Sequence, residues 1–402
     1  MIFYVSLTRE ILIPMKQFLL TVLALFFWFF PSAQIITGAE QTNRYFTLLQ
    51  HKRVAVCFNP TSVIGKNHLV DTLLSAHIYI VKIFAPEHGF RGEAEAGAII
   101  QSTTDAKTGI PIVSLYGKNK KPTNEQLKDV DIILFDMQDV GCRFFTYIST
   151  LHYVMEAAAA AKVPVLILDR PNPNGFFVDG PVLEEKFKSF VGMHPVPIVH
   201  GMTIGEYAQM INGEKWLENN LICDLQIIKC ENYTHSSRYS LPINPSPNLG
   251  SDEAIYLYPS LCFFEGTDIS LGRGTPTPFQ IFGHPNLTTG DFYFTPEPIK
   301  GVSENPPQKG KKCRGFDLTN EARKNLQENN SINLSYLITA YKHFPKEMKF
   351  FTSSDFFDKL AGNSTLRWQI INGKTEEEIR ASWQPALDNF KKIRNKYLIY
   401  PE

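Results

Sequence analysis

The stretch from 131 to 168 reads DIILFDMQDVGCRFFTYISTLHYVMEAAAAAKVPVLIL and decides the fold class. It holds two short apolar runs, at 131–135 and 163–168, with a helical pattern over 146–162 between them. Apolar runs that lack the polar alternation of a solvent-facing strand are typical of strands buried on both faces of a parallel sheet. The stretch therefore predicts parallel strands that are joined and covered by a helix.

The same alternation of apolar runs and helical patterns extends along the chain on both sides. We expect further strands at 53–58, 78–84, 110–115 and 225–228. We expect further helices at 68–76, 123–128 and 203–212. Strands that alternate with helices in this way predict a Rossmann-like, doubly wound α/β sheet.

The second half of the chain has a different pattern. Residues 231–252 are rich in Pro, Asn and Ser, and turn-rich segments follow before helical patterns return at 334–343 and 375–396. A change of composition of this kind indicates a domain boundary. We therefore predict a Rossmann-like domain over 35–245 and a smaller α+β domain over 246–402.

The N-terminus has the pattern of an export signal. Residues 15–34 read MKQFLLTVLALFFWFFPSAQ, with a lysine, an apolar run and then small residues. This order is typical of a secretory signal peptide, and the apolar run is shorter than the roughly 20 residues that cross a bilayer. We predict a signal peptide over 1–34, with Met15 as the true start. The mature chain is then periplasmic or secreted and has no stable membrane span, while an uncleaved anchor stays open as the alternative.

Charge and cysteine content exclude several classes of protein. The chain has 40 basic and 40 acidic residues, which argues against a general nucleic-acid binder because such a protein needs a basic surface. The six cysteines form no C-x-x-C pair, so we expect mostly buried free thiols and at most one disulfide. G-x-G-x-x-G, P-loop and H-E-x-x-H motifs are absent from the sequence, and we expect no cofactor and no metal.

Polar side chains follow the predicted strands where each strand ends. These candidates for substrate or catalytic roles are Glu87, His88, Asp136, Asp139, Asp169 and Asn172. Because ligands of doubly wound sheets bind beyond the carboxyl ends of the strands, we expect the three acid-bearing turns to meet at one crevice. This convergence favours an enzyme.

Two carboxyl groups across a crevice suit glycoside hydrolysis. Glu87 at a crevice wall is our candidate general acid, and Asp139 is our preferred partner, because such hydrolysis usually needs a pair of carboxyl groups. A structural alternative stays open for each: Glu87 caps the following turn, and Asp136 or Asp139 caps the helix near 146. Their separation, which distinguishes retention from inversion of configuration, does not follow from the sequence.

The remaining candidates are substrate-binding residues. Arg143 and Arg273 are suited to clamp a carboxylate or to neutralise nearby acids, and Tyr147 is suited to donate a hydrogen bond. Asp169 and Asn172 lie in the stiff segment DRPNP, whose prolines fix the backbone. His88 is a candidate for orienting Glu87 or for binding substrate, with a structural histidine as the alternative.

Together these motifs resemble one known family, the exo-β-N-acetylmuramidases of bacterial peptidoglycan turnover (NamZ-type hexosaminidases). The matching stretches are PEHGFRGEAEAG (86–97), SLYGKNKKPT (114–123), FDMQDVGCRFFTYISTLHYVMEAA (135–158), LDRPNPNG (168–175), HGMTIGEYA (200–208), PSPN (245–248), EGTDISLGRGTPTPF (265–279) and DKLAGN (358–363). They span nearly the whole mature chain, in order. The departures that we notice are Phe145, where Tyr is expected, and Asp179, where Glu is expected.

The resemblance implies a function. It implies removal of N-acetylmuramic acid from the non-reducing end of cell-wall glycan fragments, in a cleft of the Rossmann-like domain that the smaller domain closes. It implies a catalytic Glu87, no nucleotide and no metal, and Arg143 or Arg273 suits the lactyl carboxylate of muramic acid. Two alternatives stay open. One is another hydrolase, although the G-x-S-x-G elbow is absent, and the other is a non-catalytic periplasmic binder of sugar or muropeptide.

Overall fold

The computed structural model describes residues 34–402, except 88, 92–102 and 326–330. The predicted signal sequence therefore lies outside the described residues, apart from Gln34, and stays a prediction. Within the described residues, no helix is both long enough and apolar enough to cross a membrane.

A seven-stranded sheet forms the centre of the first half, in the order β5-β6-β4-β1-β7-β8-β9. Its strands are β1 (Val54–Phe58), β4 (Ile80–Ala85), β5 (Thr103–Thr104), β6 (Pro111–Ser114), β7 (Ile132–Asp136), β8 (Val165–Leu168) and β9 (Leu225–Ile228). All neighbours pair in parallel except the short edge strand β5, which is antiparallel to β6. Every residue of β1, β7 and β8 is buried, so the predicted α/β class is confirmed.

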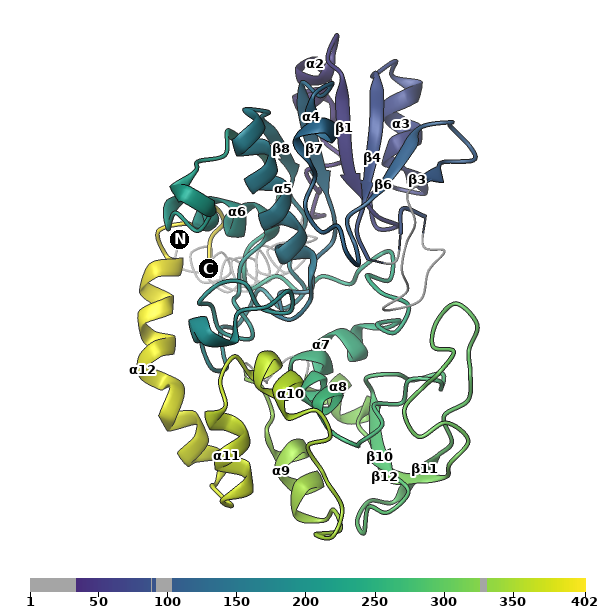
Figure 1. Ribbon diagram of the computed structural model, residues 1–402, viewed down its shortest axis with the longest axis vertical. Helices are drawn as coiled ribbons and strands as arrows, with labels where there is room; N and C mark the ends of the chain where they lie inside the picture. The colour runs from purple at the N-terminus through teal and green to yellow at the C-terminus, as the bar shows by residue number, and fades with distance from the viewer. Residues whose placement is uncertain (1–33, 88, 92–102, 326–330) are drawn as a thin grey trace, which may run out of the picture. The chain divides into compact units, whose positions relative to one another are not determined.

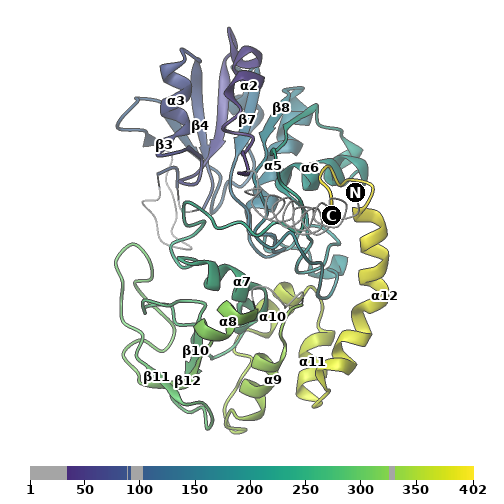
Figure 2. The same cartoon turned by 180° about the vertical axis from the view of Figure 1, so that it is seen from behind.

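Helices cover both faces of this sheet (Figures 1 and 2). They are α2 (Thr42–Leu49), α3 (Leu69–Ser75), α4 (Asn124–Leu127), α5 (Tyr147–Ala161) and α6 (Ile204–Gly213). Because side chains alternate along a strand, β1 sends Ala55 and Cys57 to the core under α4, α5 and α6. Val54, Val56 and Phe58 of the same strand join the core under α2 and α3.

Local capping sets where several of these helices begin. The Thr203 hydroxyl accepts from the Glu206 amide, and the Glu206 side chain accepts from the Thr203 amide, so the two residues form a capping box at the start of α6. Thr123 caps α4 in the same way. Helix α5 ends where Lys162 takes a left-handed conformation.

The second half is built from short helices and a small sheet. The helices are α7 (Asp252–Leu261), α8 (Thr319–Asn325), α9 (Ser335–Lys342), α10 (Ser354–Ala361), α11 (Thr365–Ile371) and α12 (Glu376–Arg394). The strands β10 (Ile281–His284), β11 (Phe292–Phe294) and β12 (Cys313–Asp317) form an antiparallel sheet in the order β10-β12-β11. Minor elements of the whole chain are β2 (Val63–Ile64), β3 (Asn67–His68) and the 3₁₀ turns Glu185–Phe187, Glu218–Asn220 and Cys262–Gly266.

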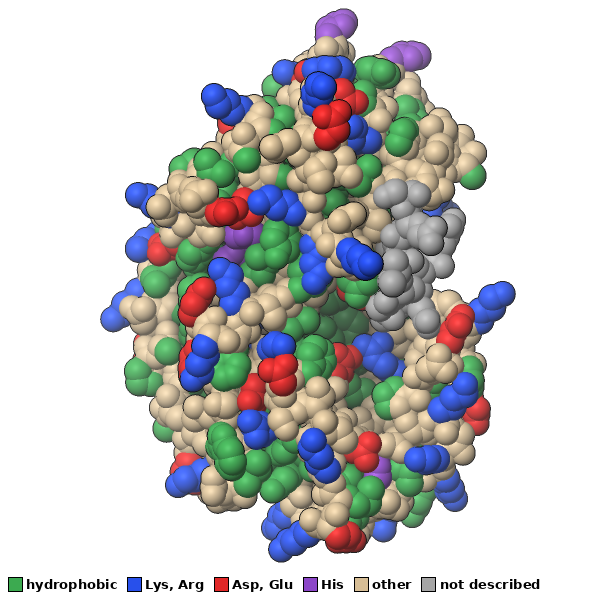
Figure 3. Space-filling view, viewed as in Figure 1, with side chains coloured by type: hydrophobic (Ala, Val, Ile, Leu, Met, Phe, Trp, Pro, Cys, Tyr) green, Lys and Arg blue, Asp and Glu red, His purple; other side chains and the backbone are tan. Residues whose placement is uncertain are grey.

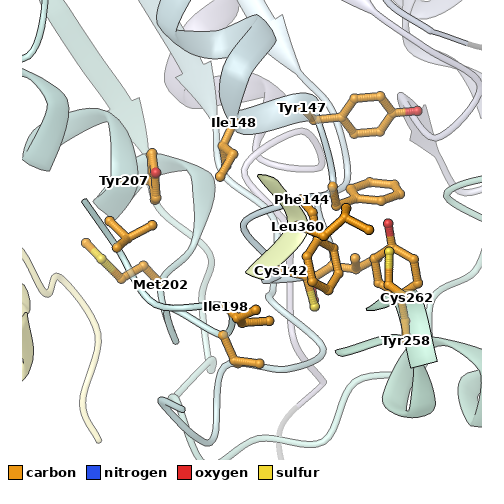
Figure 4. Close-up of a cluster of buried hydrophobic side chains, with 14 of the residues drawn as sticks. Cys142, Phe144, Tyr147, Ile148, Ile198, Met202, Tyr207, Tyr258, Cys262 and Leu360 are labelled. Atoms are coloured by element: carbon orange, nitrogen blue, oxygen red, sulfur yellow. The ribbon is translucent and has the colours of Figure 1, made fainter. Parts of the chain in front are cut away.

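One hydrophobic core runs from the sheet into the second half. Ile148 of α5, Tyr207 of α6, Tyr258 of α7 and Leu360 of α10 belong to the same buried cluster (Figure 4). The chain from Ile36 to the C-terminus accordingly forms one compact unit, and the division at residue 245 stays a prediction. All six cysteines are buried and free, as expected.

A buried chain of hydrogen bonds links α5 to α6. Nδ1 of His194 forms a hydrogen bond with the Tyr207 hydroxyl at 3.0 Å, and its Nε2 forms one with Nδ1 of His152 at 2.9 Å. Nε2 of His152 in turn lies 3.3 Å from Oε2 of Glu156. Glu156 also accepts from Lys121 at 2.6 Å. The carboxyl group of Glu156 is therefore part of a structural network.

Because of these two histidines, we expect the stability of the fold to fall at acidic pH. Burial lowers the pKa of His152 to about 4 and holds the pKa of His194 well below its ordinary value. Below about pH 6.5 the unfolded chain binds more protons than the folded chain, so stability is full above that pH and falls towards pH 4. Urea unfolding at pH 7.5 and pH 5 should show a loss on the order of 2 kcal/mol from His152, to which His194 adds in the same direction. The loss should be smaller in His152→Gln, and an equal loss would contradict the assignment.

Candidate active site

A cavity of about 560 Å³ lies beyond the carboxyl ends of the strands and is lined from both halves of the chain. A hollow is visible near the middle of the molecule in the space-filling view (Figure 3). Its lining includes Glu87, Tyr116, Phe145, Thr146, Tyr147, Phe190, Tyr258, Glu265, Arg273 and Glu304. Three carboxyl groups, an arginine and several aromatic rings therefore face one space.

Glu87 reaches this cavity because β4 ends at Ala85 and Pro86 turns the chain. The Tyr116 hydroxyl donates to Oε1 of Glu87 at 3.0 Å, and the Thr146 hydroxyl donates to Oε2 at 3.4 Å. Burial raises the pKa of Tyr116, so its hydroxyl keeps its proton and remains a donor. Each carboxyl oxygen of Glu87 thus accepts a hydrogen bond, and these two bonds fix the orientation of the carboxyl group. His88 lies outside the described residues.

Tyr147 and Arg273 line the same cavity from opposite halves of the chain. The Tyr147 hydroxyl donates to the Pro245 carbonyl at 3.2 Å, so its ring is fixed at the start of α5. Arg273 pairs with Glu265, with Nη2 2.5 Å from Oε1, and its guanidinium lies 5.0 Å from the centre of the Phe279 ring. The structure therefore brings Glu87, Tyr147 and Arg273 together.

Asp139 does not line the cavity. Its side chain is buried, and Oδ1 accepts from the Gly141 amide at 2.6 Å. Burial raises the pKa of Asp139 to about 7, and Oδ2 has no hydrogen-bond partner among the described residues. Its role as the second catalytic carboxyl group stays a prediction.

Asp136 is paired inside the protein. Arg170 donates to it through Nε at 2.5 Å and Nη2 at 2.8 Å, and both side chains are buried. Arg170 also donates to the Val63 carbonyl at 3.1 Å. This bidentate pair links the end of β7 to the segment after β8, and the cavity lining does not include it.

Asp169 and Asn172 hold neighbouring loops and do not line the cavity either. Asp169 accepts from the Thr203 hydroxyl at 2.7 Å, the Gly205 amide at 2.9 Å and the Tyr400 hydroxyl at 2.7 Å. Asn172 donates to the Met202 carbonyl at 2.9 Å. These bonds tie the end of β8 to α6 and to the C-terminal residues. A substrate-binding role for either residue stays a prediction.

Arg143 is buried and donates only to backbone carbonyls in the described part of the chain. They belong to Pro181 at 2.8 Å, Val196 at 2.7 Å and Leu360 at 2.8 Å. Burial lowers the pKa of Arg143 to about 9. The carbonyl of Leu360 lies in the last turn of α10, where the helix dipole favours a cation. Arg143 thus links the two halves of the chain, and of the two arginines only Arg273 lines the cavity.

Sequence reasoning missed Tyr116, Thr146 and Glu265 as cavity residues. Each lies inside a stretch that we matched to the muramidase family. Tyr116 follows a predicted strand but is not an acid, and Thr146 and Glu265 do not directly follow a strand. Glu265 is eight residues before Arg273, and the spacing alone does not reveal that both face the same cavity.

Comparison with known proteins gives consistent matches over the length of the chain. Residues 54–253 match the family model of the N-terminal part of exo-β-N-acetylmuramidase NamZ, and residues 256–400 match the model of its C-terminal part. The peptidoglycan β-N-acetylmuramidase NamZ of Bacillus subtilis is 40% identical over 369 residues, which cover 88% of each chain.

Solved structures agree with this assignment. A crystal structure of a DUF1343 family protein from Bacteroides fragilis is 48% identical, with a TM-score of 0.84. A second DUF1343 family protein of that organism is 29% identical, with a TM-score of 0.74. Each comparison covers 92% of this chain and all of the other chain. This chain therefore belongs to the exo-β-N-acetylmuramidase NamZ family.

Proposed function

We propose that this protein is an exo-acting glycoside hydrolase that releases N-acetylmuramic acid from the non-reducing end of peptidoglycan fragments. The observation that carries the proposal is Glu87, whose carboxyl group faces the cavity between the hydroxyls of Tyr116 and Thr146. Membership of the NamZ family and the named activity of the Bacillus subtilis relative support it.

In this reaction Glu87 is the general acid. It donates its proton to the glycosidic oxygen while the bond from that oxygen to the anomeric carbon breaks, and a water molecule supplies the new hydroxyl group. The products are free N-acetylmuramic acid and the shortened fragment. After Glu87 has given up its proton, its carboxylate accepts a hydrogen bond from the Tyr116 hydroxyl. This hydrogen bond stabilises the carboxylate.

The partner carboxyl group is either Asp139, predicted from the sequence, or Glu265. Glu265 faces the cavity and is held by Arg273, whereas Asp139 is buried and absent from the lining. Comparing Asp139→Asn with Glu265→Gln distinguishes the two, because only the partner should lower turnover without raising KM.

Arg273 is the residue that we assign to the lactyl carboxylate of muramic acid. An arginine that pairs with a carboxylate contributes about 1.5–3 kcal/mol, so Arg273→Ala should lower kcat/KM for a muramic glycoside roughly tenfold or more. Activity of the wild type and of the variant on the matching N-acetylglucosamine glycoside, which has no carboxylate, should be low and change little. An equal loss on both glycosides would show that Arg273 acts through Glu265, with which it pairs, and not on the lactyl carboxylate.

The same assay tests the proposed function. Turnover of a chromogenic N-acetylmuramic glycoside, well above that of the N-acetylglucosamine glycoside, is the expected result. Binding of muramic acid without turnover of either compound would favour a non-catalytic sugar-binding protein instead.

We also propose that the protein acts outside the cytoplasm, in the periplasm or as a secreted enzyme. The apolar segment that follows Lys16 supports this location, which also gives access to peptidoglycan. N-terminal sequencing of the mature protein should give a start near Gln34. A mature protein that starts at Met1 or Met15 would contradict cleavage.

A further inference from the structure

The segment 117–122, GKNKKP, begins directly after the cavity residue Tyr116 and contains three lysines. Lys121 is neutralised by Glu156 at 2.6 Å and Glu218 at 3.7 Å. Lys118 and Lys120 differ from it: among the described residues neither has an acidic side chain within 4 Å. This segment therefore carries two ammonium groups that have no acidic partner in the described part of the chain.

Lys120 is held at the edge of the cavity. Its Nζ lies 4.3 Å from the centre of the Phe190 ring, and Phe190 lines the cavity. The Tyr153 ring stacks beside Phe190 with 6.3 Å between centroids and 15° between planes. The Ser149 hydroxyl donates to the Phe190 carbonyl at 2.7 Å. The ring is thus fixed from α5, and the attraction between cation and ring limits where the ammonium group lies.

The positive charge of this segment differs from the charge of the cavity interior and from the net charge of the whole chain. The chain carries 40 basic and 40 acidic residues, and the cavity is lined by Glu87, Glu265 and Glu304 beside Arg273. Cations beside the cavity that lack an acidic partner among the described residues suit an anionic ligand that extends out of it. In the proposed reaction one muramic residue is released, so the rest of the glycan extends out of the cavity.

We propose that the rest of the glycan leaves the cavity at the edge where Lys120 lies, and that Lys118 and Lys120 bind lactyl carboxylates of its muramic residues beyond the scissile bond. The proposal rests on the proposed function and adds that the enzyme acts faster on longer, carboxylate-bearing fragments. Lys120 lies at the edge of the cavity and Lys118 is exposed two residues before it, so their contribution depends on ionic strength. They take no part in the chemical step.

Three compounds test this assignment. The first is a chromogenic muramic glycoside, which has no sugar beyond the scissile bond. The second is a peptide-free tetrasaccharide with a second muramic residue, and the third has N-acetylglucosamine in place of that second residue. The variant is Lys118→Gln/Lys120→Gln, and the matched control is Lys128→Gln, an exposed lysine that lines a different groove.

We expect the double variant to lower kcat/KM for the carboxylate-bearing tetrasaccharide about fivefold and to weaken its salt dependence. The chromogenic glycoside and the neutral tetrasaccharide should be turned over as by the wild type, and Lys128→Gln should change nothing. Equal losses on both tetrasaccharides, or no loss on either, would overturn the proposal. Failure of the wild type to turn over any of the three would instead overturn the proposed function.

Discussion

Glu87→Gln should lower turnover of a natural muramic disaccharide by about 10²–10⁴-fold while leaving its binding nearly unchanged. The amide keeps the size of the side chain and an oxygen that can accept from Tyr116 or Thr146, but its N–H groups are not acidic enough to protonate the leaving oxygen. A sugar alcohol is a poor leaving group, so its departure depends on that proton. Steady-state kinetics and direct binding measurements give the two quantities separately.

Comparing two substrates with different leaving groups shows whether Glu87 acts as the general acid or has another role. A nitrophenyl glycoside leaves as a weakly basic anion, so its turnover by Glu87→Gln should fall much less than that of the disaccharide. Glu304→Gln, which removes another carboxyl group that lines the cavity, serves as the matched control and should retain most activity. Equal losses on both substrates would argue that Glu87 is not the acid.

Arg170→Met should destabilise the fold by about 3–5 kcal/mol. The substitution removes both hydrogen bonds from a guanidinium to Asp136 and leaves that carboxyl group buried without its partner. Burial already raises the pKa of Asp136 although Arg170 opposes the shift. The free energy of unfolding, measured in urea at pH 7, gives the size of the effect.

The double variant Asp136→Leu/Arg170→Met should recover most of this loss, because no unpaired charge remains in the interior. A loss below about 1 kcal/mol in the single variant would show that the pair is not important for folding.

The pair also bears on the prediction that Asp136 binds substrate. If Asp136 contacts substrate, Asp136→Asn should raise KM in the folded enzyme; if it only holds Arg170, KM should stay unchanged.

Most of the sheet could be predicted from the sequence because its central strands are apolar on both faces. The strand expected at 131–135 is β7 (Ile132–Asp136), and the helix expected at 146–162 is α5 (Tyr147–Ala161). The edge strand β5 and the hairpin of β2 and β3 were missed. These strands are two residues long and contain no fully buried residue, so no apolar run identifies them.

The candidate site was harder to predict because a strand end places a residue near the crevice but does not orient its side chain. Glu87 faces the cavity, whereas Asp136 and Asp169 point to partners inside the protein. Those partners are distant in sequence: Asp169 meets Tyr400, 231 residues later. Without an alignment, one sequence does not distinguish a buried, satisfied acid from an acid that faces a ligand.

The most direct test of the central claim is the first product released from a peptide-free glycan chain. The chain would be labelled at its reducing end, begin with N-acetylmuramic acid, and be followed by mass spectrometry. An exo-β-N-acetylmuramidase releases free N-acetylmuramic acid first and leaves a labelled chain that begins with N-acetylglucosamine. Disaccharides or internal fragments as first products, or release of N-acetylglucosamine before muramic acid, would contradict the account.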